Sequence, residues 1–262
     1  MDNSPNLHHL MQDTGLWQAS RIDCGGRRRG LPTGLKGLDD LLPDGGWPRD
    51  GVTEFLCERP GIGELRLVAP ALAKLSDSTS RWILWVNPPH VPYAPALHQA
   101  GIDPVRVLVA RPGTTRDFLW TLEKALASKS CSAVLAWPGN IRESEIRRLQ
   151  VASREGECWH LMFRRAEHAR QSSPAELRLD VRPGIPSPLS LSACIRVKIL
   201  KRRGGWATES LTLDFNDRLN LRTPLFPDLE GSLDLTRPPT GNWAIAGMAG
   251  IDDEPHEQYR RQ

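Results

Sequence analysis

The chain has 262 residues, which is enough for one large α/β domain with short appendages. Its 39% hydrophobic and 25% charged residues are ordinary for a soluble globular protein, and no apolar run approaches the roughly 20 residues of a membrane span. A net charge of +3 is too small to indicate nucleic-acid binding by itself. The N-terminus has no basic segment followed by an apolar one, so we expect a cytoplasmic protein without a membrane segment.

The first 30 residues are expected to form an N-terminal arm and linker. Leu7, Leu10 and Met11 share one face of a short possible helix, and the stretch from Gly25 to Gly30, rich in glycine and arginine, then breaks the periodicity.

Residues 31–215 read as one core domain in which apolar runs alternate with helical periods. Two sets of apolar residues recur at helical spacing, one from Leu65 to Leu75 and one from Phe118 to Leu126. This alternation predicts a doubly wound α/β fold with a mostly parallel sheet, and period-two runs without helices between them then predict antiparallel edge strands. The parallel strands are expected at Val52–Cys57, Trp82–Val86, Val105–Ala110, Ala133–Trp137 and Trp159–Phe163, and the later strands at Leu177–Val181, Ala193–Leu200 and Leu211–Phe215.

Residues 216–262 lose this periodicity and contain several prolines, so we expect a tail that stays disordered until it binds a partner. Phe226 and Trp243 are its candidate partner-binding residues, because buried aromatic side chains dominate binding energies. The alternative is that the first part of the tail packs back on its own domain.

The five cysteines are odd in number, widely spaced and free of any C-x-x-C pair, which argues against a disulfide framework and a zinc ribbon. His160 and His168 lack a third ligand near them in sequence. We therefore expect reduced, mostly buried thiols, no metal and no cofactor.

Four tryptophans in predicted strands or on an apolar helical face are expected in the core: Trp85, Trp120, Trp137 and Trp159. Four others lie in turns or terminal segments, where an exposed indole is a better candidate for protein contact: Trp17, Trp47, Trp206 and Trp243.

The stretch LPTGLKGLDDLLPDGGWPRDGVTEFLCERPGIGELRLVAPAL contains a T-G-x-x-x-L-D turn, a G-G-x-P turn, a strand and a glycine loop that opens a helix. This order resembles the RecA family. An ATP-binding loop reads G-x-x-x-x-G-K-S/T, because its N–H groups and lysine hold phosphates and its hydroxyl binds Mg²⁺. Aligning Gly63 with the last glycine places Glu58 at the first glycine, Glu64 at the lysine and Leu65 at the hydroxyl, so a carboxylate would face the phosphates.

Two further acidic residues of an ATPase are also replaced. Pro89 stands before His90 where the water-activating glutamate is expected, and the strand that ends at Trp137 has no metal-binding aspartate. The sequence therefore predicts a RecA-like fold with a degenerate nucleotide loop and no enzymatic activity. An unconventional ATPase that uses Arg66 in place of the lysine, and an unrelated α/β domain with a glycine turn, remain alternatives.

From about Leu16 to Leu213 the chain also resembles ImuA, a RecA-like family associated with damage-induced translesion DNA synthesis. The resemblance is carried by LPTGLKGLDDLLPDGGWPRD, PGIGELRLVAPALAKLS, WVNPPHVPYAPALHQAGID, AVLAW and RVKILKRRGG. It implies a non-catalytic accessory protein of mutagenic DNA repair and the SOS response. The implied partners are ImuB and RecA, with an error-prone polymerase subunit as an indirect partner.

The densest basic cluster includes Lys201, Arg202 and Arg203. The similar segment of RecA reaches a neighbouring subunit, so these residues are partner-binding candidates, and a solvated edge without function is the alternative. The loop around Ser172–Pro174 is short and carries Glu167 and Glu176 nearby, which argues against direct DNA binding.

A second hypothesis is a cell-division inhibitor similar to SulA, which also uses a RecA-like scaffold without ATPase chemistry and binds the tubulin-like division protein. The length of this chain counts against it, because such inhibitors are short.

Overall fold

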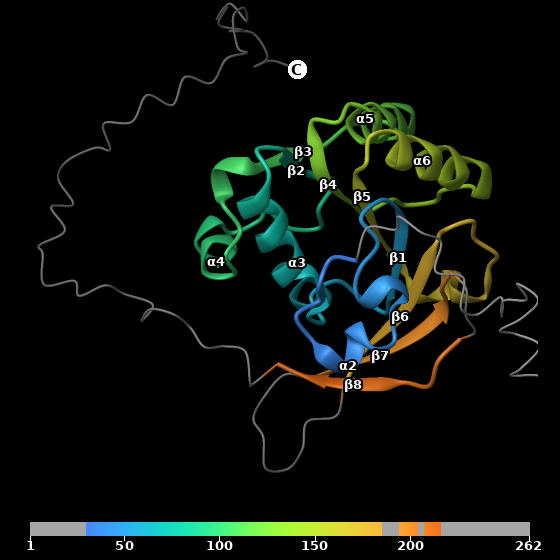
Figure 1. Ribbon diagram of the computed structural model, residues 1–262. Helices are drawn as coiled ribbons and strands as arrows, with labels where there is room; N and C mark the ends of the chain where they lie inside the picture. The colour runs from blue at the N-terminus through green and yellow to red at the C-terminus, as the bar shows by residue number, and fades with distance from the viewer. Residues whose placement is uncertain (1–29, 185–193, 204–206, 216–262) are drawn as a thin grey trace, which may run out of the picture. The chain divides into compact units, whose positions relative to one another are not determined.

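The computed structural model describes residues 30–184, 194–203 and 207–215 (Figure 1). The N-terminal arm, the tail and the predicted contact residues Trp17, Trp206, Phe226 and Trp243 lie outside these residues. In the described part, a single eight-stranded sheet is covered by helices, so the predicted α/β class with a mostly parallel sheet is confirmed.

The strands follow the order β3-β2-β4-β5-β1-β6-β7-β8 across the sheet. The first six run parallel, whereas β7 pairs antiparallel with β6 and with β8, which confirms the predicted antiparallel edge. Their bounds are β1 Gly51–Cys57, β2 Trp82–Val86, β3 Val107–Ala110, β4 Cys131–Ala136, β5 Trp159–Arg165, β6 Leu177–Pro183, β7 Cys194–Lys201 and β8 Leu211–Asp214.

Helices cover both faces of the sheet because each strand alternates its side chains between two apolar layers. On one face α3 buries Leu67 and Leu72, and on the other α5 buries Leu122 and α6 buries Leu149. In Figure 1, α5 and α6 lie side by side, and they contact each other. The α-helices are α2 Lys36–Asp39, α3 Glu64–Ser78, α4 Ala94–Gln99, α5 Thr115–Ala127 and α6 Glu143–Glu155, and the 3-10 helices are η2 Pro43–Gly45, η3 Pro104–Arg106 and η4 Ala166–Arg170.

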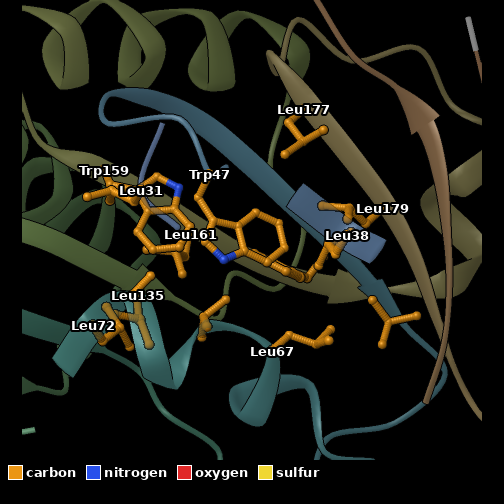
Figure 2. Packing of buried hydrophobic residues seen from close by; sticks show 14 of the residues in the cluster. Leu31, Leu38, Trp47, Leu67, Leu72, Leu135, Trp159, Leu161, Leu177 and Leu179 are labelled. Carbon is orange, nitrogen blue, oxygen red and sulfur yellow. The ribbon is translucent and has the colours of Figure 1, made fainter. Parts of the chain in front are cut away.

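The larger core includes Trp47, which the sequence predicted to be exposed (Figure 2). Its side chain is 0% exposed and its ring stacks on that of Trp159, with 5.7 Å between the ring centroids. Backbone hydrogen bonds of 2.7 and 2.8 Å between Trp47 and Leu31 hold this irregular segment over the sheet. The pairing with Leu31, which lies 16 positions earlier in the chain, therefore buries Trp47 although the local sequence is typical of an exposed turn.

The prediction for Trp120 is wrong in the opposite direction. It was predicted to lie in the core but is 61% exposed, because α5 directs Phe118, Leu122 and Leu126 toward the sheet and Trp120 projects away from it. Trp85 and Trp159 are buried as predicted, and Trp137 is half-buried. Cys57, Cys131, Cys158 and Cys194 are buried free thiols, also as predicted.

None of the helices in the described ranges combines the length and the apolar character that a membrane crossing requires.

Candidate functional site

The glycine loop joins the end of β1 to the start of α3, as the sequence predicted. Gly61 has a φ of 81° and Gly63 a φ of 105°, a region of backbone conformation that favours glycine. A side chain at position 63 would also collide with Ile195, whose Cδ1 atom lies 2.8 Å from where a Cβ would stand. Loop shape and close packing therefore both require Gly63.

Glu64, the first residue of α3, folds its carboxylate back onto this loop. Its Oε1 accepts a hydrogen bond of 2.9 Å from the Gly61 N–H, and its Oε2 accepts one of 3.1 Å from the Gly63 N–H. Loop N–H groups of this kind bind phosphate in nucleotide-binding proteins, and a negative charge is favourable at a helix N-terminus. The Glu64 carboxylate, in a residue only 3% exposed, thus supplies the negative charge that these loop N–H groups contact.

Beside the loop lies a cavity of about 350 Å³ between α3, the end of β2 and α4. Four of the residues that the sequence analysis selected line this cavity together: Glu64, Leu65, Pro89 and Trp137. Glu58 and Gly63 do not line it, and the exposed Glu58 lies 3.8 Å from the Arg182 guanidinium. Arg66 and His90 add two polar side chains to the lining. The rest is mostly apolar and includes Ala69, Leu72, Trp85, Pro88, Val91, Tyr93, Ala96, Leu97 and Ile102.

Trp85 adds a buried indole N–H to the wall of this cavity. Its ring lies 5.5 Å from that of Trp137, and its Nε1–H is buried without a hydrogen-bond acceptor among the residues that the structure describes. An indole N–H out of contact with water normally finds an acceptor, so this unpaired donor is an unfavourable feature of the cavity wall.

The outer wall of the cavity is unusually exposed for an apolar segment. No residue of α4 is buried, and Val91 and Tyr93 are 77% and 70% exposed. This wall was not among the residues predicted from the sequence. The signal that could have found it is the complete lack of Asp, Glu, Lys and Arg between Arg81 and Asp103 in a chain with 25% charged residues.

A buried ionic cluster lies on the sheet itself. Glu54 of β1 is 0% exposed and accepts hydrogen bonds from Arg164 at 3.1 Å, from Arg178 at 2.7 Å and from Ser173 at 2.7 Å. Arg178 also donates to the backbone oxygens of Gln171 and His168, each at 2.9 Å. The cluster therefore fixes the segment between β5 and β6 to the sheet.

The basic residues that were predicted to bind a partner contact the chain itself. Lys201 Nζ donates to the Ser173 carbonyl at 2.8 Å, Arg202 donates to the Leu41 carbonyl, and Arg203 lies 3.2 Å from the carboxylate of Glu176. In the described structure these three basic side chains therefore contact groups of their own domain.

The comparisons with known proteins agree on one family. The family model for cell division inhibitor SulA matches residues 52–160. The chain is 28% identical over 116 residues to cell division inhibitor SulA of Photorhabdus laumondii, covering 44% of this chain and 65% of that protein. It is 30% identical over 106 residues to cell division inhibitor SulA of Yersinia enterocolitica, covering 40% of this chain and 61% of that protein.

Each of these two matches thus spans less than two thirds of the relative's own length. Among solved structures, SulA from Pseudomonas aeruginosa is 24% identical, with 43% of this chain and 96% of that chain covered and a TM-score of 0.37. A TM-score of 0.37 is too low to compare the two folds in detail.

These matches contradict the resemblance to ImuA and the role in translesion DNA synthesis that it implied. ImuB, RecA and the polymerase subunit are likewise wrong as partners. The blocks WVNPPHVPYAPALHQAGID and AVLAW lie inside the residues that match SulA, so they do not distinguish the two families. The length argument against a division inhibitor also fails, because β6, β7, β8 and both terminal segments lie outside residues 52–160.

Proposed function

We propose that this chain inhibits cell division, and that it does so by binding another protein rather than by catalysis. The observation that carries the proposal is the match to cell division inhibitor SulA over residues 52–160. All residues that line the apolar cavity, from Pro60 to Trp137, belong to this matched part. The cavity is therefore the site that we assign to the inhibitory contact.

The chemistry of the cavity suits a protein partner. Exposed apolar side chains around a pocket are typical of protein-binding sites, where a few buried anchors supply most of the binding energy. Val91 and Tyr93 would lie at the rim of such a contact, since both side chains are largely exposed. We infer that the partner is the tubulin-like division protein, which is what a function similar to that of SulA implies.

We further propose that the scaffold is RecA-like and that its nucleotide loop is degenerate. Glu64 supplies the anion that the loop would otherwise bind, and β4 leads into Trp137 without an aspartate. On this proposal the protein acts in the cytoplasm as part of the response to DNA damage.

Overproduction in the source organism tests the proposed function. We expect the wild-type chain to give long, undivided cells, and Ala96→Asp to restore normal cell length, because Ala96 lines the cavity and a carboxylate there opposes apolar contact. Val105→Asp is the matched control, since Val105 is 79% exposed and lies outside the cavity lining. Normal cell length on overproduction of the wild-type chain would contradict the proposal, as would a fall in damage-induced mutation when the gene is deleted.

A further inference from the structure

A smaller pocket, which we call the Arg164 pocket, lies where the adjacent parallel strands β4, β5 and β1 end. It has a volume of about 260 Å³, and its lining includes Cys57 of β1, Trp137 just after β4, and Phe163, Arg164 and Arg165 of β5. In open α/β sheets, ligands bind in the crevice outside the carboxyl ends of the strands. The pocket shares part of its wall with the apolar cavity, but Arg164 and Arg165 lie outside the residues that match SulA.

The buried ionic cluster around Glu54 reaches this pocket through Arg164. Arg164 and Arg178 both contact the Glu54 carboxylate, and their side chains are only 3% and 7% exposed. Within the described residues neither arginine has a second carboxylate within ion-pair distance, so two guanidinium groups share one negative charge. Lys201, which donates to the Ser173 carbonyl, adds another cation beside them. Because buried charges are normally paired, a cluster with this excess of positive charge favours a further anion.

The two arginines of the cluster differ in how fully their donors are used. Arg178 donates from Nε to Glu54 at 2.7 Å, and from Nη1 and Nη2 to the carbonyls of Gln171 and His168, each at 2.9 Å. Arg164 donates from Nη1 to Glu54 at 3.1 Å, and its Nε is buried without an acceptor among the residues that the structure describes. The excess positive charge therefore lies at the guanidinium that lines the pocket.

The other charged side chains of the lining do not cancel this excess. Arg59 is exposed and has no ion pair or hydrogen bond from its side chain to any described residue, whereas Arg165 lies 3.6 Å from the exposed Glu167. The two acidic residues of the lining contact other groups. Glu58 lies near an arginine of β6 outside the lining, and the Glu64 carboxylate accepts hydrogen bonds from the glycine loop. Arg59 is therefore the second cation that an anion in this pocket could contact.

The chemistry of the pocket defines the class of ligand. Guanidinium groups bind phosphate and carboxylate groups through paired N–H donors. The stacked rings of Trp137 and Phe163, with 4.8 Å between their centroids, form an apolar wall that strengthens a charge interaction by excluding water. We propose that the Arg164 pocket binds a small oxyanion, whose phosphate or carboxylate group contacts the guanidinium groups of Arg164 and Arg59.

Titration of the full-length chain with inorganic phosphate and, separately, with sodium acetate tests this proposal. Sodium chloride keeps the ionic strength constant, and binding is followed by the backbone amide resonances of Phe163 and Arg165 in NMR spectra. We expect a dissociation constant of about 1 mM or tighter for at least one of the two anions. Binding of phosphate alone identifies a phosphate site, and binding of acetate alone identifies a carboxylate site. Absence of binding by both anions up to about 10 mM would overturn the proposal.

Arg164→Met is the decisive variant, because it leaves one buried arginine, Arg178, against one buried carboxylate. We expect it to stay folded and to bind the anion about tenfold more weakly than the wild-type chain. Arg170→Met is the matched control, since Arg170 is exposed and lies outside the pocket lining, and it should bind as the wild-type chain does.

Arg59→Gln tests the same contact without changing the buried cluster, and it should weaken binding about threefold. Wild-type affinity in both Arg59→Gln and Arg164→Met, or an equal loss of affinity in Arg170→Met, would overturn the proposal. If Arg164→Met does not fold, Arg59→Gln decides in the same way. None of these outcomes depends on division inhibition, so the two proposals fail separately.

Discussion

Because of His160, we expect the folding stability of this protein to fall as the pH falls below about 6.5. The residue is 0% exposed in β5, between Val52 of β1 and Val134 of β4, and in the described part of the chain neither ring nitrogen has a hydrogen-bond partner. Burial lowers the pKa of His160 from 6.5 to about 3. The folded protein therefore keeps this imidazole neutral between about pH 6.5 and about pH 3, where the unfolded chain protonates it.

The sign of the effect follows from proton linkage. Below pH 6.5 the unfolded chain binds a proton at His160 that the folded chain does not, so folding stability is complete above this pH and is lost as the pH falls toward 3. Between pH 7 and pH 5 the loss is about 2 kcal/mol, given about 1.4 kcal/mol for each pH unit below the unfolded pKa.

Urea unfolding at pH 7 and pH 5 measures this loss. Between pH 7 and pH 5, we expect the free energy of unfolding to fall by about 2 kcal/mol less in His160→Leu than in the wild-type chain, because leucine cannot take up the proton. His98→Gln, at an exposed position of α4, should keep the wild-type pH dependence. Equal pH dependence in the wild-type chain and in His160→Leu would refute the reasoning.

Three further changes test the described contacts through urea unfolding at pH 7. Glu54→Leu should cost about 3–5 kcal/mol, because it leaves two buried arginines without their counter-ion, and a loss below 1 kcal/mol would contradict this. Glu64→Ala should cost about 1–3 kcal/mol, since two loop N–H groups lose their acceptor, and unchanged stability would mean that the carboxylate does not hold the loop. Trp47→Ala should cost about 3–5 kcal/mol and Trp120→Ala less than about 0.5 kcal/mol, and similar losses would show that the assigned burial is wrong.

The strands could be predicted closely because each is a short apolar run bounded by polar or turn residues. Several strand ends differ from the prediction by two residues, and one of these differences has a clear local cause: the strand expected from Val105 begins only at Val107. Asp103 accepts a hydrogen bond of 3.0 Å from the Val105 N–H, and Pro104 follows it as the first residue of η3. A capped turn therefore takes two residues that hydrophobicity alone assigns to the strand.

The sequence selected four residues that lie close together in the structure, but it did not predict the character of the cavity that they line. Comparison with a phosphate-binding loop selected Glu64, Leu65, Pro89 and Trp137 as replacements for catalytic groups, and the structure brings all four to one cavity. What the sequence did not show is that Glu64 folds back onto the loop N–H groups and that α4 leaves its apolar residues exposed. Both depend on packing between segments that are separate in the chain.

The family assignment failed for a related reason. The blocks that suggested ImuA describe buried strands and turns of an α/β domain, and several of them lie in the part that matches SulA. Val91 and Tyr93, which we propose to contact the partner, themselves lie in one of these blocks, so a short block similar to both families does not identify the partner.

The proposed function is tested most directly by the assembly of the purified tubulin-like division protein of the same organism, measured by sedimentation. We expect the wild-type chain to prevent sedimentation at equimolar amounts. Ala96→Asp should need about tenfold more protein for the same effect, which corresponds to about 1.4 kcal/mol of binding free energy. Full sedimentation in the presence of excess wild-type chain, or equal inhibition by Ala96→Asp, would contradict the account.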